Sequence, residues 1–270
     1  MTNVYKTVYQ EALNYLTHKA GVEFVADHLK NDTNNYSPEI ETLNDLFRAL
    51  LNAVVCTKRM QEAIGPIERL QNALCGFDPI KLTSHYGEKW ELLAGNIRDR
   101  KAVANFKGVN ISDDHWAYWN MFCKSALSGA CFLMQLKTVE TFKAFVRGFE
   151  NNEMTTAVLP LLLQKEVYGF TFSSACDFLA QAGFCDYIAP DSRVKALLYD
   201  IELIDSKENY ELLKTVITIG WANNEKPNVV NKLFWIIAAG KLSEQENKNN
   251  NLRSEFIDRI TPILANLPQP

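Results

Sequence analysis

The sequence predicts an all-α protein, and three observations support this fold class. Apolar residues recur every three or four positions through most of the 270 residues, which is the spacing of one helical face. Strict alternation of apolar and polar residues, typical of a strand, is limited to short stretches such as 215–219 inside a longer helical pattern. The 12 glycines and 9 prolines are too few for a β-rich chain with many tight turns. We therefore expect a compact multi-helix bundle of about ten to thirteen helices with little or no sheet.

The N-terminal part of the chain illustrates the helical pattern. Residues 4–16 predict a first amphipathic helix. The same spacing returns over 39–56, directly after Ser37-Pro38, a pair typical of a helix start. A polar stretch at 107–114 is expected to form a loop with a capped entry into the next helix.

Composition and charge exclude several classes of protein. The chain has 28 Lys and Arg against 32 Asp and Glu, a formal net charge of −4, so only a local basic face would attract nucleic acid. No apolar run reaches the ~18 residues needed to cross a bilayer, and the polar N-terminus argues against an export signal. Six scattered cysteines predict reduced thiols, and four dispersed histidines have no metal-binding spacing. We expect a soluble cytoplasmic protein without a metal or other cofactor.

The most specific pattern of the chain is a helical hairpin. An amphipathic helix over 154–166 runs into the turn 168–171, and a second helix is expected from about Ser173. Such a tight turn needs a residue that tolerates positive φ, which Gly169 provides. Ser173 or Ser174 is the expected cap of the second helix. Unpaired amides at a helix N-terminus favour an anion such as phosphate, so the hairpin is a candidate phosphate site.

A carboxylate follows the hairpin. Asp191, after Pro190, precedes a helical pattern over 193–203 and is its expected N-cap. Basic residues near or beyond this acid that are candidates to face phosphate are Arg193, Lys195, Lys226 and Lys232.

This combination resembles the helix-hairpin-helix superfamily of DNA glycosylases, whose pattern is a hairpin L-P-G-V-G-x-K-T-A, a helix, a loop, and an Asp in V-D-T-H-V or P-D. The residues that stand at the L-P-G, V-G, T-A and P-D positions are 167–169, 170–171, 174–175 and 190–191. The spacing from Gly169 to Asp191 matches the usual gap of the family. The resemblance covers about 30 residues directly, with helical context over 115–240.

The resemblance implies a helix-hairpin-helix glycosylase-like fold with room for two lobes. Residues 111–270 would form its core, and residues 1–110 would pack on that core or extend it. Asp191 would be the catalytic carboxylate, which stabilises an oxocarbenium-like sugar or orients a water. Ser173 replaces the lysine that forms a Schiff base in bifunctional members, and Thr171 replaces the second hairpin glycine. The implied activity is therefore monofunctional hydrolysis of the N-glycosidic bond of a damaged base.

Double-stranded DNA is the partner that the resemblance implies. The residues that would hold its phosphates are Gly169, Thr171, Ser173 and Arg193. The extruded base would meet the aromatic residues Tyr118 and Trp119, although their helical spacing is also typical of a core.

Two alternatives stay open beside the glycosylase hypothesis. The first is a catalytically inactive derivative of the same fold that binds nucleic acid or a protein. The second is an unrelated helical interaction protein, in which Gly169 and Asp191 are only a turn and a cap. The glycosylase hypothesis depends on the expectation that the bend near Tyr168 and the carboxyl group of Asp191 open onto one electropositive groove.

Overall fold

A computed structural model describes residues 2–31, 40–100, 116–240 and 251–267. Within these residues all regular secondary structure is helical, with fourteen α-helices and two short 3-10 helices, which confirms the all-α class. The helices slightly outnumber the expectation because glycines divide some apolar runs. Gly21, for example, has a φ of 88° and separates two N-terminal helices.

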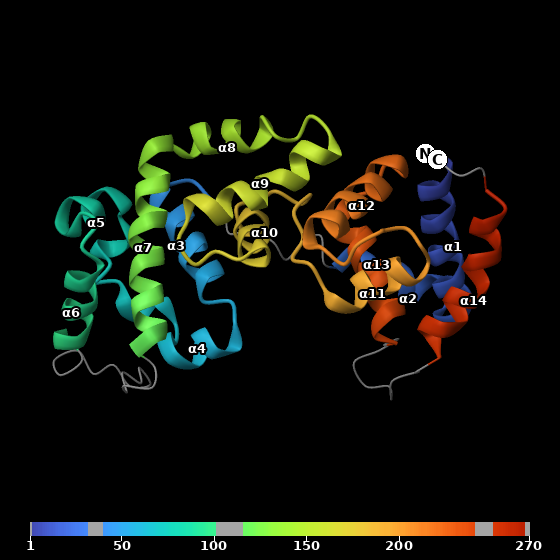
Figure 1. Cartoon of the computed structure of the whole chain (residues 1–270), viewed down its shortest axis with the longest axis horizontal. Helices are drawn as coiled ribbons and strands as arrows, with labels where there is room; N and C mark the ends of the chain where they lie inside the picture. The colour runs from blue at the N-terminus through green and yellow to red at the C-terminus, as the bar shows by residue number, and fades with distance from the viewer. Residues whose placement is uncertain (1, 32–39, 101–115, 241–250, 268–270) are drawn as a thin grey trace. The chain divides into compact units, whose positions relative to one another are not determined.

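The chain divides into two compact units, and each unit is assembled from separate stretches of sequence. Figure 1 shows these stretches in colours that follow the residue number. Unit 1 contains the described residues of Met1–Ser37, Asn152–Ala157 and Phe184–Pro270, and unit 2 those of Pro38–Asn151 and Val158–Gly183. This division differs from the expected 1–110 and 111–270, because the N-terminal helices pack with the C-terminal ones. The expected boundary at 110 and the loop at 107–114 lie outside the described residues.

Unit 1 is organised around one apolar helix. Besides the first residues of α9 (Glu153–Glu166), its helices are α1 (Thr2–Ala20), α2 (Val22–Asn31), α11 (Ser192–Asp200), α12 (Asn209–Ala222), α13 (Pro227–Ala239) and α14 (Leu252–Ala265). Helix α13 contacts all five of the others. It begins at Pro227, where the missing N–H costs no helical hydrogen bond, and ends at Gly240 in the left-handed conformation.

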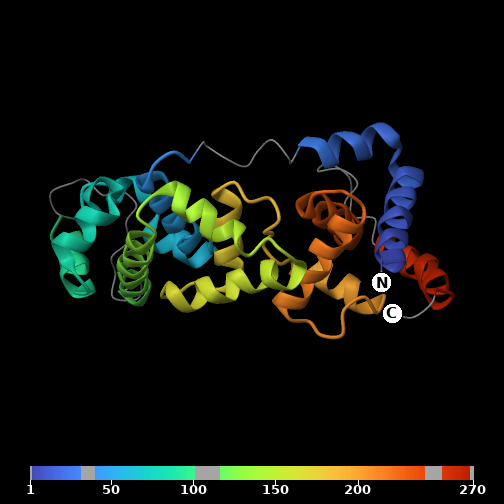
Figure 2. The same ribbon diagram turned by 90° about the horizontal axis from the view of Figure 1, so that it is seen from above.

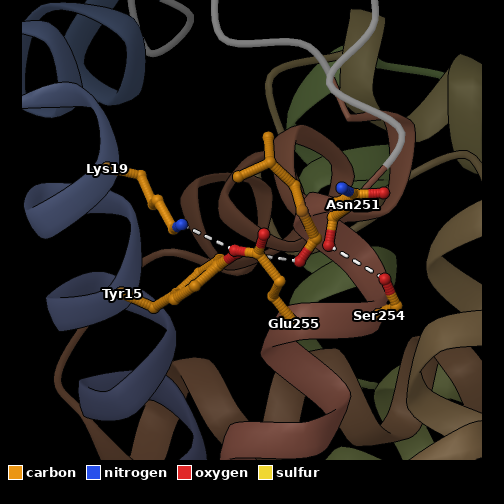
Figure 3. Close-up of polar contacts among 6 residues, drawn as sticks. Tyr15, Lys19, Asn251, Ser254 and Glu255 are labelled. Carbon is orange, nitrogen blue, oxygen red and sulfur yellow. Dashed lines mark hydrogen bonds and ion pairs between the residues drawn. The ribbon is translucent and has the colours of Figure 1, made fainter.

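Helices α1 and α14 lie side by side in unit 1 (Figure 2) and are joined by a polar cluster (Figure 3). The buried Tyr15 hydroxyl lies 3.0 Å from the carbonyl oxygen of Leu252 and 3.1 Å from a carboxylate oxygen of Glu255. The ammonium group of Lys19 forms an ion pair with Glu255 at 2.6 Å. Hydrogen bonds from Lys19 and Tyr15 lower the pKa of Glu255, and burial raises the pKa of Tyr15. The cluster therefore favours a neutral tyrosine and an ionised glutamate.

Unit 2 is organised around the 21-residue helix α7, shown in green in Figure 1. Its helices are α3 (Leu43–Val54), α4 (Lys58–Ile64), η1 (Ile67–Leu70), η2 (Cys75–Phe77), α5 (Pro79–Tyr86), α6 (Trp90–Arg100), α7 (Trp116–Leu136), α8 (Val139–Arg147), the part of α9 (Glu153–Glu166) from residue 158 onward, and α10 (Phe172–Gln181). Helix α7 contacts α3, α4, α5, α6 and α8. Gly129 allows the close approach of α3, because a Cβ there would lie 2.6 Å from Leu50 Cδ2.

Helix α3 is shorter than the pattern over 39–56 predicts. It begins at Leu43 because Thr42 and Asp45 form a capping box, in which the Thr42 side chain accepts from the Asp45 N–H at 3.2 Å. The expected start signal at Ser37-Pro38 lies outside the described residues.

The cluster between α1 and α14 yields a stability prediction. Tyr15→Phe removes the donor and leaves the buried Leu252 carbonyl without this partner, so the free energy of unfolding should fall by about 1 kcal/mol. Urea denaturation followed by circular dichroism measures the loss. Tyr199→Phe is the matched control, since the Tyr199 side chain is exposed. Equal effects of the two substitutions would contradict the role assigned to the Tyr15 hydroxyl.

Candidate functional site

The bend between α9 and α10 belongs to unit 2 and has the tight form that the sequence predicts. Helix α9 ends at Glu166 and α10 begins at Phe172. Gly169 has a φ of 75° in the turn. A Cβ at this position would lie 2.8 Å from Ser125 Oγ and 3.3 Å from Met121 Cγ on α7. Gly169 is therefore required both for its backbone conformation and for its close approach to α7.

Two amides of the hairpin are satisfied within unit 2. The Tyr168 N–H donates to Ser128 Oγ on α7 at 2.9 Å, and the Phe170 N–H donates to the Val167 carbonyl at 3.2 Å. These hydrogen bonds fix the first half of the turn against α7. The same amides are consequently not available to an anion.

The cap of α10 is Thr171, so the prediction of Ser173 or Ser174 was wrong. Thr171 Oγ1 accepts from the Ser174 N–H at 3.1 Å and lies 2.9 Å from the Ser174 hydroxyl. The helix begins one residue earlier than expected because the threonine already has the extended backbone that an N-cap needs. The N–H groups of Phe172 and Ser173 have no acceptor among the described residues, and they remain as donors at the start of α10.

A chain of polar side chains connects α10 to the end of α3. Ser174 Oγ lies 3.7 Å from the thiol of Cys56, which in turn hydrogen-bonds to Asp177. Burial raises the pKa of Asp177, and the hydrogen bond from Cys56 opposes this shift. Burial also raises the pKa of the Cys56 thiol, so the thiol is not an activated nucleophile.

In unit 1, Asp191 is the N-cap of α11, as the sequence predicts. Its Oδ1 accepts from the N–H groups of Arg193 at 2.7 Å and Val194 at 3.3 Å. The side chain is half-buried, and Oδ2 has no hydrogen-bond partner within the described part of the chain. The cap thus holds Oδ1, and Oδ2 takes no part in it.

A tryptophan close to this cap in unit 1 contacts two cations. The Arg193 guanidinium is 5.9 Å from the ring centroid of Trp235 on α13, and the Lys232 ammonium is 5.8 Å from it. Both distances are within the range of cation–π interactions. Trp235 is not among the predicted site residues, and its spacing of three residues from Lys232 was the only signal of this cluster in the sequence. Lys195, another predicted cation, instead donates to the Asn209 side chain.

The two aromatic residues expected near a base both lie on α7 in unit 2. The Trp119 side chain is 1% exposed and makes an edge contact with Phe122, so protein atoms cover its ring faces. This is the core role that helical spacing allows. Tyr118 is half-buried.

The predicted site residues therefore fall into two sets, each described within its own unit. Gly169, Thr171 and Ser173 come together in the hairpin of unit 2, and Asp191 and Arg193 come together at the start of α11 in unit 1. No known protein family, curated protein or solved structure matches this chain. No helix among the described residues is long and apolar enough to cross a bilayer, and no three metal-ligating side chains cluster there.

The close approach of Gly169 to α7 predicts a stability defect. Gly169→Ala should lower the free energy of unfolding by about 2 kcal/mol, because positive φ is strained for alanine and the methyl group would meet Ser125. Gly183→Ala is the matched control, since Gly183 also has positive φ but no atom within 4 Å of an added Cβ. Chemical denaturation should show the larger loss at 169. An equal or larger loss at 183 would show that packing against α7 does not constrain the turn.

The half-buried Asp177 predicts a pH dependence of stability. Its raised pKa means that the folded protein retains a proton that the unfolded chain releases, so stability falls as pH rises from the ordinary aspartate pKa through the raised one. Asp177→Asn should raise the free energy of unfolding at pH 7 and flatten this slope. Denaturation at several pH values tests both effects, with exposed Asp258→Asn as control. If Asp177→Asn is less stable than the parent protein at pH 7, burial of the ionised Asp177 carboxylate does not destabilise the fold.

Proposed function

We propose that this protein binds double-stranded DNA and hydrolyses the N-glycosidic bond of a damaged base, with Asp191 as the essential carboxylate. The observation that carries the proposal is the combination of a bend at Gly169 with a carboxylate at the spacing typical of helix-hairpin-helix glycosylases. The detailed geometry of each part supports a distinct role.

The start of α10 supports phosphate binding by the hairpin. The N–H groups of Phe172 and Ser173 stand where the partial positive charge of the helix N-terminus is concentrated. Thr171 caps the helix with its side chain and thereby holds these amides in place. In this proposal a backbone phosphate of DNA accepts from them.

The cap at the start of α11 supports the catalytic role of Asp191. Two amides hold Oδ1, while Oδ2 is left to face the reacting sugar or a water. As the bond between C1′ and the base nitrogen breaks, the base takes the electron pair and the sugar becomes cationic. Water then supplies a hydroxyl group to C1′, and the remaining proton of that water neutralises the departing base.

Two further residues shape this proposal. Ser173 stands where a Schiff-base lysine would be needed, so the expected product is an abasic site in an unbroken strand. Arg193, which contributes to the cap through its amide and contacts Trp235 through its guanidinium, supplies positive charge for a neighbouring phosphate.

A second candidate function is DNA binding without catalysis. The observation that favours it is the internal satisfaction of two hairpin amides, those of Tyr168 and Phe170. A hairpin with fewer free donors holds phosphate less tightly, as does the replacement of the second hairpin glycine by Thr171. This candidate predicts salt-dependent affinity for DNA without release of any base.

Asp191→Asn tests the catalytic role. Asparagine is also a good N-cap, so the fold should persist while the negative charge is lost, and base release should slow about 100-fold or more. The assay uses a panel of duplexes that each carry one alkylated, oxidised or deaminated base, and measures free base and abasic sites. Asp78→Asn is the matched control, because Asp78 caps α5 in unit 2 through the same two-amide arrangement.

The outcomes separate the candidates. Release by Asp191→Asn as fast as by the parent protein would remove Asp191 from the mechanism. Salt-dependent duplex binding by the parent without base release from any member of the panel would favour the binding module, and absence of binding at low salt would overturn both.

A further inference from the structure

Unit 2 contains a cavity of about 320 Å³ beside the hairpin turn. The start of α6, one side of α7 and the end of α9 with Tyr168 form its walls. Leu127 and Phe132, both buried residues of α7, contribute an apolar lining. This volume lies at the lower end of the range for ligand pockets, about 300–1,000 Å³, and suits a ligand with one small ring system.

Two aromatic rings and one cation distinguish this cavity. The Lys124 ammonium lies 4.6 Å from the ring centroid of Trp90 and 5.3 Å from that of Tyr168. Tyr168 is 51% exposed although it is a large aromatic residue. The hydrogen bond from its N–H to Ser128 anchors its backbone next to the turn through Gly169, and its side chain lines the cavity. The hairpin therefore holds Tyr168 in place, whereas Trp90 is the first residue of α6.

The charges of the cavity narrow the class of ligand. Lys124 has no ion-pair partner among the described residues, so its N–H donors are available to an acceptor on a ligand. The Lys124 ammonium lies over both rings, and its positive charge would repel a cationic ligand. Glu88 and Glu166 also line the cavity and outnumber the single cation, which disfavours a polyphosphate.

We propose that this cavity binds one uncharged heteroaromatic base, as a free nucleoside or as an unpaired base of a nucleic acid strand. The base displaces the Lys124 ammonium from the ring faces and stacks on Trp90 and Tyr168, as bases do on aromatic side chains in proteins that bind single strands. Lys124 donates to a carbonyl oxygen or ring nitrogen, and the two glutamates accept from exocyclic amino groups. This site is independent of base release, since all of its lining residues belong to unit 2 and Asp191 belongs to unit 1.

The test is a binding measurement on the full chain by isothermal titration calorimetry. The probes are adenosine, guanosine, cytidine and uridine in one arm, and short single-stranded oligonucleotides in the other. Trp90→Leu and Tyr168→Leu should each weaken binding about tenfold by removing a stacking surface. Lys124→Met should weaken binding of bases that present a carbonyl oxygen more than binding of adenosine, whose acceptors are ring nitrogens.

Matched controls separate the cavity from general effects. Tyr199→Leu in unit 1 removes another exposed tyrosine that has a lysine over its ring, Lys207 at 4.4 Å, and should leave the affinity unchanged. Lys165→Met removes an exposed lysine near the end of α9 with the same expectation. Asp191→Asn should also leave base binding unchanged, so loss of catalysis and loss of this site are distinguishable. Circular dichroism checks that each variant remains folded.

If free nucleosides bind saturably and the cavity variants weaken this binding, the proposal is supported and the bound base comes from a free nucleoside. Binding of oligonucleotides alone, weakened by the same variants, would support it with the nucleic acid strand as the source. Absence of binding in both arms at millimolar concentration would overturn it. So would binding that Trp90→Leu and Tyr168→Leu leave unchanged.

Discussion

The turn between α9 and α10 can pack against α7 only because position 169 has no side chain. A Cβ there would overlap the hydroxyl of Ser125, and the backbone has a φ that other residues rarely adopt. This contact brings the Tyr168 amide within hydrogen-bonding distance of Ser128 and places Thr171 at the start of α10. The free amides of α10 and the position of Tyr168 in the lining of the neighbouring cavity both depend on it.

The proposed chemistry assigns separate tasks to the two units. Unit 2 supplies amides for an anion at the start of α10, and unit 1 supplies a carboxylate that its own helix cap orients. The cluster of Trp235 with Arg193 and Lys232 adds positive charge on the same unit as the carboxylate. The formal net charge of −4 therefore coexists with a local pair of cations, which the proposed phosphate contacts would use.

Local features of the fold could be predicted from the sequence, whereas long-range ones could not. Helical spacing, the turn at Gly169 and the cap at Asp191 depend on neighbours within a few positions, and all three are confirmed. The cap at Thr171 was missed because threonine and serine compete at adjacent positions and only the backbone conformation decides between them. The packing of α1 with α14 and the cavity around Lys124 join residues far apart in sequence, which no local pattern reveals.

Amide hydrogen exchange of the full chain, with and without a duplex that carries an abasic-site analogue, tests the central claim most directly. If the hairpin holds phosphate and Asp191 serves the sugar, the duplex should slow exchange at 171–173 and at 192–194, and high salt should reverse the protection. Protection confined to other segments, or no change at either one, would contradict the account.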